Sequence, residues 1–169
     1  GFAVWNGCVI DHINLGGAYV HLGYLSIPLT VLWIAGLTNA INFIDGLDGL
    51  ACGVSAISSL SLMIVVLLNG DIVSTVIFGI LFGSCLGFLP FNSNPARIFM
   101  GDTGALFLGY SLAVMSVSGV FKLHAVLSFI VPLIVFAIPI FDAFFAIVRR
   151  LIAGKSPFSA DRGHLHHRL

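Results

Sequence analysis

The sequence carries very little charge, and it contains no glutamate. Only 8% of its 169 residues are charged, whereas 59% are hydrophobic, and all seven acidic residues are aspartates. Seven basic residues balance them, so the net charge is zero, which excludes a general polybasic attraction to nucleic acid. A mean hydropathy of +1.10 is far too high for a soluble domain of this length. We therefore predict that most of this chain lies in a lipid bilayer.

Cysteine is also scarce. The three cysteines, Cys8, Cys52 and Cys85, have neither paired nor metal-type spacing. Cys52 and Cys85 fall within apolar runs, where we expect each thiol to behave as a small buried hydrophobic group.

The hydrophobic residues form five long runs. Each has roughly 20 residues, enough for an α-helix to cross a hydrocarbon layer of ~30 Å. The runs lack the alternation of membrane β-strands, so helices are the way to satisfy the backbone in lipid. We predict an all-α fold, a polytopic transmembrane helical bundle with about five spanning helices, at residues 25–44, 50–68, 72–89, 103–121 and 125–148.

The basic residues lie mostly on one side of the predicted membrane. Lys122 alone falls on the first side, and the others fall on the second: Arg97, Arg149, Arg150, Lys155, Arg162 and Arg168. The positive-inside rule makes this second side cytoplasmic. We therefore expect a single membrane domain, 1–169, with an extracytoplasmic segment at 1–24 and a cytoplasmic His/Arg loop at 149–169.

The first cytoplasmic connection, residues 45–49, is the end of the polar segment NAINFIDGLDG, residues 39–49. Its Asn39, Asn42, Asp45 and Asp48 are spaced by three, so neighbouring members lie within reach along a helical surface. Mg²⁺ prefers oxygen ligands and takes one or two protein groups when phosphates fill other positions. The segment predicts a cation site; the alternative is that Asp and Gly only cap and turn a helix end.

The second cytoplasmic connection reads PFNSNPARIFMGDTG, residues 90–104. Arg97 offers a fixed positive charge, and Asp102 stands just before the next span. One interpretation makes Asp102 an ordinary N-cap. The other makes it part of a metal site shared with Asn42 and Asp45, because a helix N-terminus also favours phosphate.

The C-terminal tail is the only long polar stretch. Its histidines and arginines can donate several hydrogen bonds to a diphosphate, with Arg as the bidentate partner. Zinc binding is a weaker alternative, because HLHH lacks a second ligand pair. A solvated basic tail is the third interpretation.

Three motifs together carry a family resemblance: NAINFIDGLDGL (39–50), NPARIFMGDTGALFLG (94–109) and DRGHLHHRL (161–169). They resemble the polyprenyl-phosphate N-acetylhexosamine-1-phosphate transferases, glycosyltransferase family 4. The resemblance runs from about residue 25 to residue 169, and the HLHHRL ending is similar to the GlcNAc-1-phosphate branch.

The resemblance implies transfer of a sugar 1-phosphate, with GlcNAc-1-phosphate favoured, from a UDP-N-acetylhexosamine to undecaprenyl phosphate, with release of UMP. This reaction would start cell-envelope polysaccharide synthesis at the cytoplasmic face of a bacterial cytoplasmic membrane. The implied cofactor is Mg²⁺, or Mn²⁺ in its place, at Asn42 and Asp102. We expect Asp45, Asp48 and Asp102 to be catalytic. Substrate binding is assigned to Asn39, Arg97, His164, His166, His167 and Arg168.

One family motif has no match here. A further pair of aspartates near an earlier helix is absent before residue 25, so we expect this chain to be a fragment that is inactive alone. A phospho-MurNAc-pentapeptide transferase-like enzyme, a membrane transporter and a decayed, non-catalytic scaffold stay open as alternatives. The expected partners are the two substrates and the bilayer; a homodimer is left open.

Overall fold

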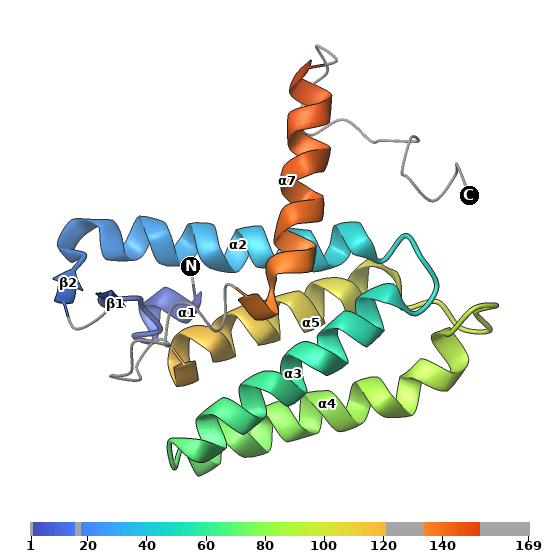
Figure 1. Ribbon diagram of the computed structural model, residues 1–169, viewed down its shortest axis with the longest axis horizontal. Coiled ribbons are helices and arrows are strands. Elements are labelled where there is room, and N and C mark those ends of the chain that lie inside the picture. The colour runs from blue at the N-terminus through green and yellow to red at the C-terminus, as the bar shows by residue number, and fades with distance from the viewer. Residues whose placement is uncertain (1, 16–17, 121–133, 153–169) are drawn as a thin grey trace.

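The computed structural model describes residues 2–15, 18–120 and 134–152. Within these ranges most residues are helical, and one short hairpin lies near the N-terminus (Figure 1). The elements are α1 (Phe2–Trp5), β1 (His12–Leu15), β2 (Ala18–His21), the 3-10 helix η1 (Gly23–Leu25), α2 (Ser26–Ile44), α3 (Leu50–Leu68), α4 (Ile72–Asn92), α5 (Gly101–Met115), the π-helix η2 (Ser116–Val120) and α7 (Ala137–Ile152).

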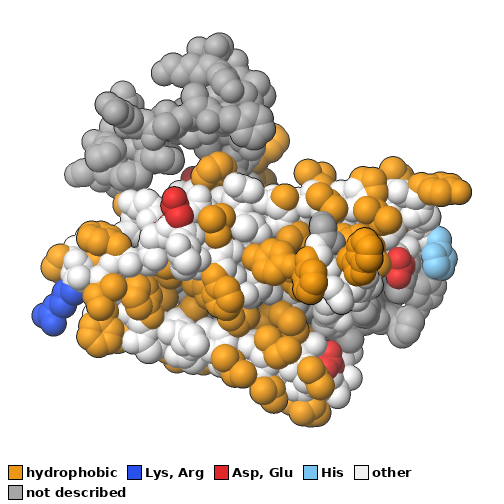
Figure 2. All heavy atoms as spheres, turned by 180° about the vertical axis from the view of Figure 1, so that it is seen from behind, with side chains coloured by type: hydrophobic (Ala, Val, Ile, Leu, Met, Phe, Trp, Pro, Cys, Tyr) orange, Lys and Arg blue, Asp and Glu red, His pale blue; other side chains and the backbone are white. Residues whose placement is uncertain are grey.

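Three of the described helical segments are long and apolar enough to cross a membrane. They are Gly23–Ile44, with a mean hydropathy of 1.6, and Leu50–Leu68 and Ile72–Asn92, each with 2.3. The predicted all-α membrane bundle is therefore confirmed, but the predicted count of five spans is not. Figure 2 shows hydrophobic side chains over the middle of the bundle, with most acidic, basic and histidine side chains towards its ends.

The last two predicted spans differ from the observed helices. The run at 103–121 corresponds to α5, which begins at Gly101, followed directly by the π-helix η2. The run at 125–148 lies partly outside the described residues, and α7 continues past its predicted end to Ile152. In Figure 1, α7 stands away from the other long helices and crosses α2.

The four helices α2 to α5 form two packed antiparallel pairs. Helix α2 packs mainly against α5, and α3 packs mainly against α4. The first pair approaches closely at Gly109, where an added Cβ would lie 2.8 Å from the Thr38 Cα atom. Small residues allow such close approach between helices in lipid, where van der Waals packing rather than the hydrophobic effect holds helices together.

The two ends of the bundle differ in structure. One end carries the β1–β2 hairpin, in which His12 pairs with His21 across antiparallel strands, and the turn between α3 and α4. At that turn Asp71 caps α4 by accepting a hydrogen bond of 3.0 Å from the Ser74 N–H. The opposite end carries the α2–α3 and α4–α5 connections (Figure 1). The two connections that were predicted to be cytoplasmic thus lie at the same end, although no strand was predicted in 1–24.

Candidate functional site

The candidate site is built around a contact between α2 and α5. The Asn42 side-chain amide donates a hydrogen bond of 3.1 Å to Oδ1 of Asp102, across 60 residues of sequence. Asn42 lies one turn after Thr38 on α2, so the close approach of Thr38 and Gly109 brings this part of α2 against α5. Packing of small residues inside the bundle therefore positions two polar groups at its end.

Asp102 lies in the first turn of α5 and does not cap it. The N-cap residue of α5 is Met100, and no side chain forms a cap hydrogen bond there. The Asp102 carboxylate is therefore available to Asn42 and to the space in front of the helix. A carboxylate in the first turn also interacts favourably with the positive end of the helix dipole.

Asp45 follows α2 as its C-cap residue and lies close to Asp102. Burial raises the pKa of the Asp45 carboxyl above its ordinary value of 3.8, and the neighbouring Asp102 charge raises it further. A hydrogen bond with the Gly101 backbone acts in the opposite direction. Two nearby carboxylates that repel each other are a place where a cation would be favoured.

Asp48 connects the two loops at this end of the bundle. Its Oδ2 atom accepts a hydrogen bond of 2.9 Å from the Ala96 N–H. The loops also approach at Gly49, which has φ +73°, and an added Cβ there would lie 3.4 Å from the Ser93 Cα atom. Glycine is favoured at Gly49 because other residues rarely adopt this left-handed conformation.

Two predicted binding residues lie at this end without joining the Asn42–Asp102 contact. The Asn39 amide donates a hydrogen bond of 2.7 Å to the Ala35 carbonyl oxygen of its own helix. Arg97 follows Ala96, and its side chain is exposed. The remaining predicted residues lie outside the described part of the chain: His164, His166, His167 and Arg168.

Asn92, the last residue of α4, was not predicted as a residue of the site. Asn92 is buried, and its amide nitrogen donates a hydrogen bond of 3.0 Å to the Ile98 carbonyl oxygen. Its Oδ1 atom has no hydrogen-bond partner within the described structure. The bond to Ile98 shows that Asn92 orders the loop before α5. The signal for it was a polar residue shortly after the apolar run, two positions after Pro90.

The oxygen groups at this site fit a hard divalent cation. No cluster of three His, Cys, Asp or Glu side chains occurs in the part of the chain that the structure describes. The available donors are instead two carboxylates, Asp45 and Asp102, and the Asn42 side-chain oxygen. This set suits Mg²⁺, which commonly uses one or two carboxylates and fills its other positions with water and phosphate oxygens.

Comparison with known proteins gives a consistent result. Residues 2–120 match the family model described as "Glycosyl transferase family 4". The chain is 50% identical over 149 residues to a "Probable undecaprenyl-phosphate N-acetylglucosaminyl 1-phosphate transferase" of Bacillus subtilis strain 168, which covers 88% of this chain and 41% of that protein.

Two further relatives show how widely the similarity extends. A "Decaprenyl-phosphate N-acetylglucosaminephosphotransferase" of Mycobacterium leprae is 44% identical over 163 residues, covering 85% of this chain and 41% of that protein. A "Phospho-N-acetylmuramoyl-pentapeptide-transferase" of Streptococcus equi subsp. zooepidemicus is 41% identical over 109 residues, covering 64% of this chain and 32% of that protein. The chain thus spans about two fifths of the length of the first two relatives.

Proposed function

Since the chain belongs to glycosyl transferase family 4, we propose that it forms part of a membrane enzyme that transfers N-acetylglucosamine 1-phosphate to undecaprenyl phosphate. The proposed donor is UDP-N-acetylglucosamine, and the products are UMP and a lipid-linked diphosphate sugar. One observation carries this proposal: Asn42 contacts Asp102, beside Asp45, at a single end of the bundle.

The proposed reaction exchanges one phosphoanhydride bond for another. An oxygen of the lipid phosphate attacks the β-phosphorus of the UDP-sugar and forms the new P–O–P bond. The bond from the β-phosphorus to the bridging oxygen breaks, and UMP leaves with that oxygen. The lipid phosphate is already an anionic nucleophile, so the reaction requires mainly alignment and neutralisation of negative charge.

The residues of the site suit alignment and charge neutralisation. Asn42 and Asp102 would hold Mg²⁺, which would neutralise phosphate charge when bound. Asp48 holds the second connection in place through the Ala96 N–H. The first N–H groups of α5 favour an anionic phosphate, because they lack partners within the helix.

The proposed orientation places this end of the bundle in the cytoplasm. Arg97 lies at this end, directly after Ala96, and the positive-inside rule puts basic residues on the cytoplasmic side. The opposite end carries the hairpin and Asp71. A cytosolic nucleotide sugar would then meet the lipid phosphate at the inner leaflet of a bacterial cytoplasmic membrane.

The decisive experiment identifies the lipid product. Membranes containing the full-length protein are incubated with undecaprenyl phosphate, Mg²⁺ and a panel of UDP-sugars. The molecular masses of the lipid products are then measured by mass spectrometry. We expect a lipid diphosphate that carries N-acetylglucosamine, formed together with UMP. A product carrying N-acetylmuramoyl pentapeptide would instead favour the phospho-MurNAc branch, and sugar uptake without a lipid product would favour a transporter.

A further inference from the structure

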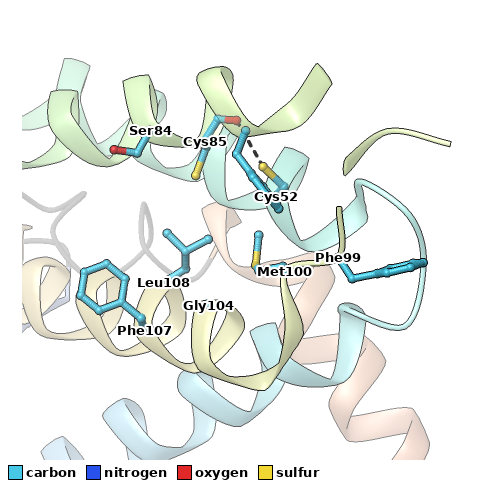
Figure 3. Close-up of a pocket in the computed structure, with 9 residues that line it drawn as sticks. Cys52, Ser84, Cys85, Phe99, Met100, Gly104, Phe107 and Leu108 are labelled. Carbon is cyan, nitrogen blue, oxygen red and sulfur yellow. Dashed lines mark hydrogen bonds between the residues drawn. The ribbon is translucent and has the colours of Figure 1, made fainter. Parts of the chain in front are cut away.

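Two cysteines from neighbouring helices share the wall of one apolar pocket. Cys52 lies in the first turn of α3 and Cys85 lies on α4, and both line a pocket of about 270 Å³ (Figure 3). Both side chains are almost completely buried, with exposed fractions of 0% and 2%. The antiparallel packing of α3 and α4 therefore brings together two thiols that are 33 residues apart in the sequence.

The two cysteines are in direct contact. The Cys52 thiol donates a hydrogen bond of 3.3 Å to the Cys85 carbonyl oxygen, which is the dashed line in Figure 3. The two thiols are also within hydrogen-bond reach of each other, and both are free. The Cys85 carbonyl lies inside α4, where it also accepts a backbone N–H of the next turn. It therefore keeps a partner if the Cys52 thiol loses its proton to bind a metal ion.

Met100 supplies a third sulfur atom to the same pocket. It directly precedes α5, and in Figure 3 its side chain points towards the side of the pocket that carries the cysteines. Gly104 leaves room for it, because an added Cβ at Gly104 would lie 2.5 Å from the Met100 Cγ atom. Methionine is flexible, and its thioether is a soft metal ligand, so Met100 can reach an ion held by the two thiols.

These sulfur atoms select a particular class of ion. Thiolate and thioether ligands favour soft cations, whereas Mg²⁺ prefers oxygen. Zn²⁺ usually takes four ligands, and the lining of this pocket, all of it within the described residues, contains no third Cys and no His, Asp or Glu. Two thiolates and a soft divalent ion such as Hg²⁺ form a neutral complex, which an apolar pocket accommodates better than a net charge.

Binding of such an ion requires no oxidant or reductant. With HgCl₂, the two S–H bonds and the two Hg–Cl bonds break, and two Hg–S bonds form. Two protons and two chloride ions leave to the water. Reagent and complex are both neutral, so neither places a net charge in the apolar part of the bundle.

We propose that Cys52, Cys85 and Met100 form a binding site for a soft, thiophilic divalent metal ion, which would bridge α3 to α4 and to the start of α5. This site goes beyond the proposed function and is independent of it. It uses none of the oxygen groups of Asn42, Asp45 or Asp102, so it would bind a different class of ion from the candidate Mg²⁺ site.

Retention of mercury against a monothiol tests the paired thiols. The full-length protein in detergent is loaded with one equivalent of HgCl₂ and dialysed against a series of glutathione concentrations, and the bound mercury is measured by mass spectrometry. The thiols lie on packed helices, so the second Hg–S bond forms at a high effective concentration. We expect Cys52→Ala and Cys85→Ala each to lower the apparent affinity for Hg²⁺ at least about 100-fold.

Cys8→Ala is the matched control. Cys8 is also buried, but its thiol donates a hydrogen bond of 3.6 Å to the Val114 carbonyl oxygen, and it does not line the pocket. Cys8→Ala should therefore retain mercury as the wild type does. Met100→Leu keeps the apolar volume but removes the third sulfur atom, so it should weaken retention by a smaller factor. Wild-type retention by Met100→Leu would overturn the assignment of a third ligand.

Two results would overturn the site itself. One is wild-type retention by Cys52→Ala or Cys85→Ala, with thermal unfolding used to show that the variants are folded. The other is an X-ray absorption spectrum of the mercury-loaded wild type that shows fewer than two sulfur ligands. If either alanine variant does not fold, this wild-type spectrum decides, because it requires no substitution.

Discussion

Asn42 at the end of α2 donates a hydrogen bond of 3.1 Å to Asp102 at the start of α5, and this bond joins the two helices at the candidate site. Asp45 adds a second carboxylate, and Asp48 joins the two loops through Ala96. The Asn42–Asp102 and Asp48–Ala96 contacts each give a prediction for the full-length protein.

Asp102→Asn should abolish most of the Mg²⁺-dependent transfer. The variant keeps the size of the side chain but removes its charge, so we expect product formation to fall by at least about 100-fold, the loss typical of removing one preorganised electrostatic group. Asp102 is exposed, so the thermal unfolding midpoint should change little. Asp142→Asn, on the exposed surface of α7, is the control. Near-normal turnover of Asp102→Asn would remove Asp102 from the mechanism.

Gly109→Ala should separate α2 from α5. Its new Cβ would meet the Thr38 backbone, so we expect a loss of about 1 to 3 kcal/mol in stability, as in other overpacked interiors. Transfer should fall too, because Asn42 would move away from Asp102. Gly83→Ala is the matched control, since an added Cβ there has no neighbour within 4 Å. Equal thermal unfolding of the two variants in detergent would show that the helices tolerate this contact.

Asp48→Ala should loosen the loop before α5. The Ala96 N–H would lose its acceptor, and because this contact is exposed we expect a small stability loss of about 0.5 to 1 kcal/mol. Asp48→Asn retains an oxygen acceptor and should protect the amides of this loop from hydrogen exchange better than Asp48→Ala does. Hydrogen exchange at residues 93–98 measures the difference. If both variants exchange at the wild-type rate, the Asp48 bond does not hold the loop.

Asp71→Ala should remove the cap of α4 and lower the free energy of unfolding by about 1 kcal/mol at neutral pH. Hydrogen bonds from the Ser74 hydroxyl and backbone lower the pKa of Asp71 below 3.8. Its stabilising effect is therefore complete above pH 3.8 and is lost as the pH falls through the lower, folded-state value.

Thermal unfolding of wild type and Asp71→Ala between pH 7 and pH 2 tests whether the stabilising effect of Asp71 is lost in acid. The gap between their midpoints should be constant near neutrality and narrow in acid. Asp71→Asn, which can still cap, should remain close to the wild type at pH 7. A gap that widens in acid would contradict the assignment.

The sequence predicted three of the membrane helices, α2 to α4, because apolar runs of this length directly reflect the thickness of a bilayer. It also placed Asn42, Asp45 and Asp102 at one end. Successive connections between spanning helices lie on opposite sides of the membrane, so the α2–α3 and α4–α5 connections lie on the same side. The pairing of α2 with α5 was not predictable from the apolar runs, since it depends on a local fit such as Thr38 against Gly109. Neither was the burial of Asn92, whose position reads from sequence as an ordinary loop residue.

The β1–β2 hairpin and α7 were harder to predict for different reasons. The hairpin is short and lies within a segment that hydropathy marks only as lying outside the bilayer. Helix α7 contains apolar residues that suit a spanning helix, but its direction is set by its contacts with α2. Composition alone does not determine that direction.

The pairing of α2 with α5 also sets an order for biosynthesis. As the chain enters the membrane, α3 and α4 can pack together at once because they are consecutive, whereas α2 acquires its main partner only after both of them have been inserted. A nascent chain arrested at the end of α4 would thus contain a helical hairpin without the Asn42–Asp102 contact. Formation of that contact would therefore report that insertion and helix assembly have reached α5.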